Sequence, residues 1–398
     1  MQRKNYCALP FYNLNIDSDS MRPCCIIDQT EWDPFESKGR TLKDVWRSTQ
    51  FEQVRESFRK DEQYPRCNIC WKAEQTGVPS ARQGYNSQLL DTLGLPETDS
   101  VDDLPKMIQW TVSNTCNFAC RTCSLEYSTG WLRETRLLAD ENDRDAKERL
   151  QQHTKRRWDH ERYGDVEKLF ANCVWLEIMG GETLLTDELV PMLQKLITKG
   201  LSKQITLVIT TNGSVGPTDE IARVLTQFKA MRLTFSIDAV TPDAFKYIRT
   251  GDFDQVSANI TAWQHFDNIR LYVNPTISIL NMWCLDDILK WTNKTFGIGN
   301  IGHNWVTDPS YYAVPIMPDA MKQHIQDNST YFHTQKFLPY MWSGKHNPGA
   351  WQEFLRRQKW LDESRQQPMK KYLPELYDLI NKQINKQKDT TTWHSTLK

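Results

Sequence analysis

Three cysteines lie close together in this chain, at Cys116, Cys120 and Cys123. Their C-x3-C-x2-C spacing supplies three thiolates, one fewer than the four that close a [4Fe–4S] cluster. A structural zinc site normally takes its four ligands in two pairs, which this triplet does not offer. The spacing therefore indicates an iron–sulfur cluster whose fourth iron is open to a substrate or cofactor.

A second group of thiols lies near the N-terminus, and its members are Cys7, Cys24, Cys25, Cys67 and Cys70. Four thiolates close an iron–sulfur cluster or a zinc site equally well, so the spacing alone leaves both open. The chain holds ten cysteines, and its first residues show no hydrophobic stretch of the kind found in secretory signals. We therefore expect metal ligands and buried thiols rather than disulfides, and a reducing, cytoplasmic location.

Length and charge exclude several classes of protein. The 398 residues suffice for one large domain and a smaller one, and the formal net charge is −1. This balance gives no sign of a nucleic-acid partner or an acidic disordered tail. Because no apolar run approaches about 18 residues, we expect no membrane span.

Strand-like and helix-like segments alternate in the middle of the chain. The strand patterns cover residues 107–113, 174–179, 205–211, 232–237, 270–279 and 301–306. The clearest helical patterns between them cover residues 187–199, 219–229, 253–266 and 285–296. This alternation predicts an α/β fold with a parallel sheet and right-handed crossovers. Six such units form either an open barrel or a doubly wound sheet, and the pattern does not decide between them.

The flanking segments have a different character. A turn-rich stretch at 94–104 reads as a linker after a cysteine-rich region that contains a short strand (12–16) and a helical pattern (42–58). A charged segment at 125–165 predicts a helical insertion, and residues 318–388 predict a helical C-terminal cap. We therefore expect an α+β module at 1–93, a core at 105–310 and the cap.

Residues with chemical potential follow the predicted strands in order. After the second, third and fourth strands come Gly180, Gly181 and Glu182, then Asn212, then Ser236 and Asp238. The carboxyl ends of parallel strands meet at one edge of a sheet, where ligands bind. We therefore expect these residues to gather near the three cysteines of the first strand.

This set of motifs resembles the radical S-adenosylmethionine (radical SAM) enzymes across about residues 107–307. The resemblance implies a partial (β/α)6 TIM-like barrel in which Cys116, Cys120 and Cys123 hold a [4Fe–4S] cluster. It also implies that the amino and carboxylate groups of SAM chelate the open iron. Reductive cleavage of SAM then yields a 5′-deoxyadenosyl radical that abstracts hydrogen from a substrate.

The resemblance also assigns roles to the residues at the strand ends. The Gly-Gly-Glu run would meet the SAM amino group, Ser236 and Asp238 would lie near the ribose hydroxyls, and Asn212 would line the same cleft. Arg249 would pair with the SAM carboxylate, with an ordinary surface charge as the alternative. Two departures from the family pattern are Thr122, where an aromatic residue is common, and a threonine in place of proline after Glu182.

The N-terminal cysteines resemble the Twitch/SPASM auxiliary-cluster modules of the same family. These modules carry a cysteine before a short hairpin, cysteines after it and a late C-x2-C pair. Here the module precedes the core, a permuted order, and the usual hairpin glycine is missing. The resemblance implies a second [4Fe–4S] cluster, and its ligands would be Cys7, Cys24, Cys67 and Cys70, with Cys25 as a spare thiol.

Several readings of function remain open at this point. The first is a radical SAM enzyme that modifies a peptide or protein side chain and takes electrons from a donor such as flavodoxin or ferredoxin. The second is a radical SAM enzyme that acts on a small molecule of a cofactor or sugar pathway. The third is a non-catalytic iron–sulfur or zinc scaffold. The remaining candidates, Cys173, Cys284 and His303, read as structural residues.

Overall fold

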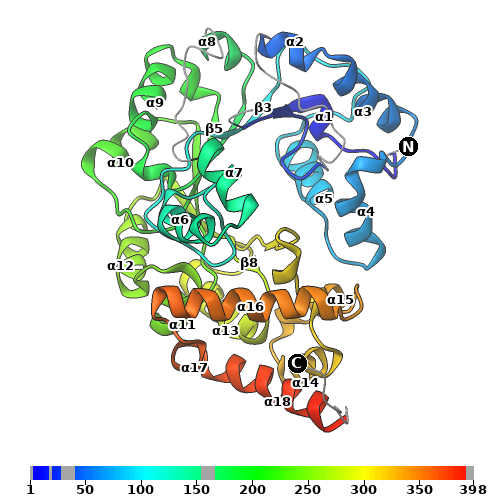
Figure 1. Cartoon of the computed structure of the whole chain (residues 1–398). Coiled ribbons are helices and arrows are strands. Elements are labelled where there is room, and N and C mark those ends of the chain that lie inside the picture. Colours follow the sequence, from blue (N-terminus) through cyan, green and yellow to red (C-terminus); the bar gives the residue numbers. More distant parts are fainter. Residues whose placement is uncertain (1–2, 18–19, 28–40, 154–165, 391–398) are drawn as a thin grey trace. The chain divides into compact units, whose positions relative to one another are not determined.

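The computed structural model describes residues 3–17, 20–27, 41–153 and 166–390 (Figure 1). The chain divides into two compact units, which are described separately below. Unit 1 comprises residues 1–117, 125–235 and 258–271, and unit 2 comprises residues 118–124, 236–257 and 272–398. The predicted division into module, core and cap stays a prediction, because the compact units reflect packing and not cofactor sites.

A seven-stranded sheet with the order β2-β1-β3-β4-β5-β6-β7 dominates unit 1. Its strands are β1 (Asn13–Ile16), β2 (Met21–Arg22), β3 (Met107–Thr111), β4 (Trp175–Met179), β5 (Thr206–Thr211), β6 (Ala230–Phe235) and β7 (Ile269–Val273). Strands β1, β3, β4, β5 and β6 pair in parallel, and β2 is antiparallel to β1. From β3 to β7 the order follows the chain without the reversal of a doubly wound sheet. The α/β fold is confirmed, and its strand order is that of an opened barrel.

The two faces of the sheet differ in polarity because successive side chains point to opposite sides. Leu176 and Ile178 on β4 and Leu207 and Ile209 on β5 are fully buried. Helix α9 (Leu189–Thr198) buries leucines and a methionine at helical spacing and lies beside α10 (Asp219–Leu225) (Figure 1). This apolar face holds the sheet rigid, so the strand ends can position polar groups.

The N-terminal part of unit 1 is mainly helical. Its elements are α1 (Leu9–Tyr12), α2 (Leu42–Trp46), α3 (Thr49–Arg59), η1 (Pro65–Cys67), α4 (Asn68–Gln75), α5 (Ala81–Asn86) and the π-helical turn η2 (Ser87–Thr92). Phe11, Val54, Phe58 and Trp71 form one core cluster with residues of the sheet such as Trp175. The predicted strand near residue 12 is present as β1, but it pairs in parallel with β3 in the main sheet. The sequence pattern gave no sign of this pairing.

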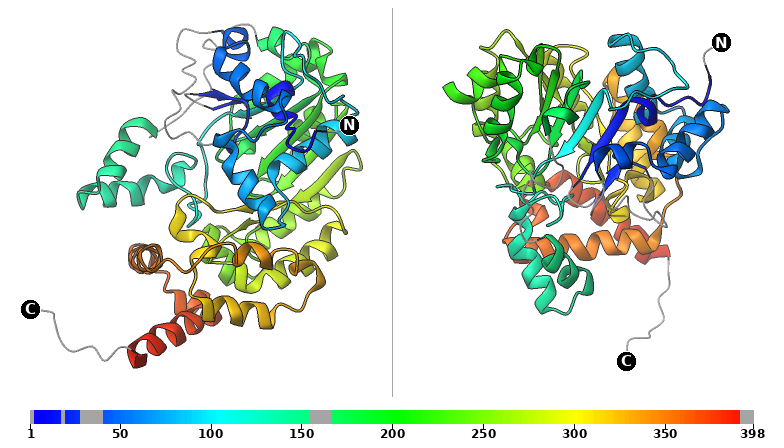
Figure 2. Two further views of the ribbon diagram at one scale, coloured as in Figure 1. Left: turned by 90° about the vertical axis from the view of Figure 1, so that its right-hand side faces the viewer. Right: turned by 90° about the horizontal axis from the view of Figure 1, so that it is seen from above.

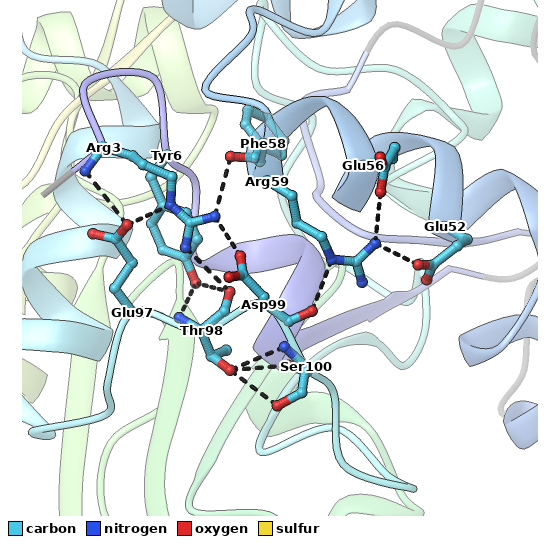
Figure 3. Close-up of polar contacts among 10 residues, drawn as sticks. All are labelled: Arg3, Tyr6, Glu52, Glu56, Phe58, Arg59, Glu97, Thr98, Asp99 and Ser100. Carbon is cyan, nitrogen blue, oxygen red and sulfur yellow. Dashed lines mark hydrogen bonds and ion pairs between the residues drawn. The ribbon is translucent and has the colours of Figure 1, made fainter.

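The turn-rich stretch at 94–104 is held firmly rather than loosely (Figure 3). The Arg3 guanidinium contacts the Glu97 carboxylate at 2.5 Å and the Asp99 carboxylate at 2.5 Å. The Arg59 Nε donates to the Asp99 carbonyl oxygen at 2.8 Å. The polar residues that suggested a linker therefore act as anchors for the N-terminal helices.

The predicted charged insertion contains α6 (Leu132–Asp140) and α7 (Arg144–His153), which pack against each other in unit 1. The last part of that insertion, residues 154–165, lies outside the described residues. The helix α8 (Val166–Leu169) follows it. Short 3-10 turns occur at η3 (Thr129–Trp131), η4 (Thr183–Leu185), η5 (Leu201–Lys203), η6 (Met282–Cys284), η7 (Ser310–Tyr312), η8 (Val314–Ile316) and η9 (Phe332–Thr334).

Helices make up most of unit 2, together with the parallel pair β8 (Thr276–Ile277) and β9 (Asn304–Trp305). Its helices are α11 (Pro242–Arg249), the start of α12 (Phe253–Trp263), α13 (Leu285–Phe296), α14 (Asp319–Asn328), α15 (Leu338–Met341), α16 (Pro348–Arg365), α17 (Met369–Tyr372) and α18 (Pro374–Thr390). The helices α16 to α18 form the orange-to-red segment of Figure 2, within the stretch predicted to be helical.

Two strand predictions were wrong in extent. The predicted strand 270–279 is two strands, β7 and β8, separated at Asn274 and Pro275. Proline has no backbone N–H to donate to a ladder, so the strand breaks there. The predicted strand 301–306 is only the two-residue β9. In the described ranges, no helix combines the length and apolarity needed to cross a membrane.

Candidate cluster and cofactor site

The loops that follow β3 and β4 approach each other closely in unit 1. The Gly181 N–H donates to the Ser113 carbonyl oxygen at 2.7 Å, and the Glu182 N–H donates to the Thr115 carbonyl oxygen at 2.7 Å. A Cβ at Gly180 or Gly181 would lie 2.4 Å from one of these two carbonyl oxygens, too close for any side chain. Both glycines are therefore needed for the approach of the two loops, and contact of this run with the SAM amino group stays a prediction.

Glu182 is completely buried, and its carboxylate joins the ends of β4 and β5. One oxygen, Oε1, accepts hydrogen bonds from the Leu184 N–H at 3.0 Å and the Thr211 hydroxyl at 2.8 Å. The other, Oε2, accepts from the Asn212 N–H at 2.6 Å. The carboxylate thus fixes the position of Asn212 as well as the turn after β4.

Asn212 in turn reaches the first cysteine of the triplet. Its Nδ2 donates to the Asn117 Oδ1 at 2.9 Å and lies 3.7 Å from the Cys116 Sγ. The Cys116 N–H donates to the Thr129 hydroxyl at 3.0 Å, which fixes the backbone of the cysteine. Within unit 1 the structure therefore brings together Cys116, Asn212 and the Gly-Gly-Glu run at the carboxyl edge of the sheet.

Unit 2 holds the remaining predicted residues. The Arg249 Nη1 contacts the Asp238 Oδ2 at 2.5 Å, and the Asp238 Oδ1 accepts a hydrogen bond from the Thr276 N–H at 2.7 Å. Both members of this ion pair are buried, so Arg249 is not a surface charge. Ser236, which is half-buried, directly follows β6. The pairing of Arg249 with the SAM carboxylate, and of Ser236 and Asp238 with the ribose, stays a prediction.

Cys120 and Cys123 lie on a short loop that packs against the end of α11 within unit 2. The Cys120 Sγ lies 3.7 Å from the Arg249 carbonyl oxygen, and the Cys123 N–H donates to the Cys120 carbonyl oxygen at 3.0 Å. The Ala119 N–H donates to the Thr250 hydroxyl at 2.8 Å. These contacts fix the shape of the loop.

The four cysteines assigned to the second cluster line one cavity in unit 1. Its lining residues are Cys7, Leu9, Pro10, Pro23, Cys24, Ile26, Ile27, Val54, Phe58, Cys67, Ile69, Cys70 and Arg82. Cys25 is not among these described lining residues. Soft thiolate donors in an apolar cavity fit an iron–sulfur cluster.

The thiols of this cavity influence one another. Burial raises the pKa of Cys7 to about 12, and the nearby Cys70 acts in the same direction. Burial also raises the pKa of Cys67, again with Cys7 and Cys70 acting in the same direction. A bound metal would reverse these shifts because it holds each thiol as a thiolate. Across the described part of the chain, no three His, Cys, Asp or Glu side chains are grouped closely enough to hold a single metal ion.

Comparison with protein families gives a match for part of the chain. Residues 110–291 match the profile of the Radical SAM superfamily. These residues therefore form a radical SAM domain. The matched radical SAM domain contains the cysteine triplet and every residue predicted to contact SAM, whereas the N-terminal cysteines lie outside it. No curated protein sequence matches the chain.

Parts of solved structures also resemble this chain, at low sequence identity. The chain is 16% identical to native anSMEcpe with bound AdoMet and Cp18Cys peptide, with a TM-score of 0.38, covering 54% of this chain and 56% of that one. It is 13% identical to Streptococcus suis SuiB bound to S-adenosylmethionine, with a TM-score of 0.36, covering 71% of this chain and 50% of that one. The chain thus spans only about half the length of these two structures.

Arg121, inside the cysteine triplet of the radical SAM domain, is a residue that the sequence analysis did not select. Its side chain is fully buried, and its guanidinium lies 3.5 Å from the Tyr247 ring centroid and 2.9 Å from the Asp362 Oδ1. It donates to the Tyr247 carbonyl oxygen at 2.9 Å and the Gln358 Oε1 at 3.1 Å. Arg121 thereby anchors the cysteine loop to α16, a contact that sequence spacing does not reveal.

A row of polar residues on the inner face of the sheet was also missed. Asn15, Gln109, Glu177 and Arg232 belong to one register row across β1, β3, β4 and β6. The Glu177 Oε2 accepts from the Gln109 Nε2 at 2.9 Å and from the Tyr85 hydroxyl at 3.2 Å. Burial raises the pKa of Glu177. Polar residues inside strands that are otherwise largely apolar were the available signal.

Cys173 and His303, which the sequence indicated to be structural residues, pack against neighbouring residues. The buried Cys173 thiol donates to the Trp175 carbonyl oxygen at 3.2 Å. The His303 ring packs edge-on against Phe337 with centroids 5.0 Å apart, and burial lowers the pKa of His303 to about 4. Both arrangements fit the roles that the sequence indicated.

Proposed function

We propose that this radical SAM enzyme cleaves SAM reductively and uses the resulting 5′-deoxyadenosyl radical to abstract hydrogen from a peptide or protein side chain. The observation that carries the proposal is the convergence of Cys116, Asn212 and the Gly-Gly-Glu run at one sheet edge of a domain matching the Radical SAM profile. An edge of this kind is where parallel α/β sheets bind ligands.

The three cysteines of the triplet would hold a [4Fe–4S] cluster with one open iron. When bound, that cluster supplies the electron that breaks the carbon–sulfur bond of SAM. The Asn212 amide, held by the Glu182 carboxylate, would direct an N–H toward the Cys116 sulfur and help set the cluster potential. Buried Asp238 and Arg249 offer a charged pair for the ribose and carboxylate of SAM.

The N-terminal cavity would hold an auxiliary [4Fe–4S] cluster on Cys7, Cys24, Cys67 and Cys70. Support comes from the cavity itself, which all four of these residues line. The peptide or protein substrate class rests on the resemblance of this module to Twitch/SPASM modules. Reduced flavodoxin or ferredoxin in the cytoplasm would supply the electrons.

Metal content tests the two-cluster proposal directly. Because each [4Fe–4S] cluster contains four irons, we expect about eight irons per chain after anaerobic reconstitution, and about four in a Cys67→Ala/Cys70→Ala variant. Elemental analysis of iron, zinc and acid-labile sulfide gives the answer. About four irons with one bound zinc in the unsubstituted chain would contradict the auxiliary cluster and leave the N-terminal module as a structural zinc site.

A further inference from the structure

The N-terminal cavity has one charged side chain among the described residues that line it, Arg82 at the start of α5. The other lining residues are the four cysteines and apolar side chains. A cluster held by four thiolates carries net negative charge and gains another on reduction. Negative charge in an apolar cavity is costly unless a cation lies nearby. The Arg82 cation therefore lies where it stabilises the more negative, reduced cluster more than the oxidised cluster.

The Arg82 side chain is fixed in place by its contacts. Its Nε and Nη2 contact the two carboxylate oxygens of Glu74 at 2.9 and 2.6 Å. Its Nη1 donates to the Tyr6 carbonyl oxygen at 2.6 Å, and its guanidinium lies 4.8 Å from the Trp71 ring centroid. The Ser80 hydroxyl donates to Glu74 at 2.5 Å, so the carboxylate is oriented as well. The cation lines the cavity, whereas Glu74 is not among the described lining residues.

The Arg82 side chain lines the same cavity as the four cysteine thiols. The Cys70 thiol also has hydrogen bonds with the Arg82 backbone and the Ser80 hydroxyl. Hydrogen bonds to cluster sulfurs and nearby charge are two of the factors that set cluster potentials.

We propose that Arg82 is a positioning residue that raises the reduction potential of the auxiliary cluster, which suits that cluster to receiving an electron rather than donating one. The inference rests on the proposed auxiliary cluster. In the test below, dithionite reduces the auxiliary cluster. The oxidised cluster takes up one electron, and dithionite is oxidised.

The test uses the full chain with Cys116, Cys120 and Cys123 all replaced by alanine, so that only the N-terminal cluster contributes a signal. After anaerobic reconstitution, the midpoint potential is measured by a dithionite titration followed by electron paramagnetic resonance. In this background Arg82→Gln is expected to lower the ratio of reduced to oxidised cluster at least tenfold at fixed potential. That change corresponds to about 59 mV for a one-electron couple.

Three further variants separate charge from structure. Arg82→Lys keeps the charge, so its ratio of reduced to oxidised cluster is expected to stay within about threefold of that of the parent. Glu74→Gln removes the opposing charge and is expected to raise this ratio. Lys72→Gln removes an exposed charge from α4, two residues from Cys70, and is expected to change little because solvent screens it. If Arg82→Gln fails to bind iron, the Glu74→Gln and Arg82→Lys titrations still decide the question.

The outcomes distinguish the inference from the function on which it rests. A parent protein with zinc or no iron in this module would refute the auxiliary cluster itself. If the parent protein binds about four irons, the auxiliary cluster is present. An Arg82→Gln midpoint potential equal to that of the parent or of Lys72→Gln would then refute only the role of Arg82. An unchanged Glu74→Gln potential together with a lowered Arg82→Lys potential would also refute it, because the charge would then not be the cause.

Discussion

Replacement of Cys120 by alanine is expected to abolish 5′-deoxyadenosine formation from SAM and dithionite. The triplet supplies three thiolates, and two are too few to hold a [4Fe–4S] cluster with an open iron. Iron content should fall from about eight to about four per chain, because the N-terminal cysteines keep their own cluster. Chromatographic measurement of 5′-deoxyadenosine in an anaerobic assay gives the result.

Cys173→Ala is the matched control for this experiment. Cys173 is also a free thiol, but it is fully buried, its Sγ donates a hydrogen bond to the Trp175 carbonyl oxygen, and it lies far from the triplet in sequence. We expect this variant to retain iron and activity. Turnover that persists in Cys120→Ala, or that disappears equally in Cys173→Ala, would contradict the ligand assignment.

Replacement of Asp362 by alanine is expected to destabilise unit 2 by about 3 to 5 kcal/mol. The change leaves the guanidinium of fully buried Arg121 without its carboxylate partner at 2.9 Å. It also removes the acceptor of the Tyr247 hydroxyl at 2.8 Å and of the Met369 N–H at 2.6 Å. Urea unfolding of the iron-free protein measures the loss of stability.

Glu363→Ala serves as the control because Glu363 is the next residue of α16 and its side chain is exposed. An exposed surface substitution of this kind changes stability by about 0.5 kcal/mol or less. Reconstitution should also yield less iron in Asp362→Ala, since the loop that carries Cys120 and Cys123 loses its anchor. Equal stability of the two variants would show that the buried contacts of Arg121 do not hold the loop.

The periodic parts of the fold could be predicted from the sequence. Strands β3, β4 and β5 and helices α9 and α13 lie within about two residues of their predicted bounds, because each buries a regular apolar face. The order of the strands could not be predicted, since pairing joins residues far apart in the chain. The parallel pairing of Asn13 with Met107 is one such contact, and local pattern carries no trace of it.

The sequence indicated which cysteines to group, but not the side chains that hold the cysteine loops in place. The resemblance to auxiliary-cluster modules grouped Cys7, Cys24, Cys67 and Cys70, and all four line one cavity, but their role as cluster ligands stays a prediction. The partners of Arg121 could not be predicted, because Gln358 lies 237 residues away in the chain. The proline at 275 could have predicted the break between β7 and β8, but the apolar residues on both sides of it favoured one continuous strand.

The central claim is that the cluster of the radical SAM domain has one iron without a protein ligand. The most direct test uses Cys67→Ala/Cys70→Ala protein, reduced under argon, whose electron paramagnetic resonance spectrum comes from that cluster alone. Addition of SAM is predicted to shift the spectrum, because the amino and carboxylate groups of SAM occupy the open iron. A spectrum that SAM leaves unchanged, or evidence that a side chain already fills that position, would contradict the account.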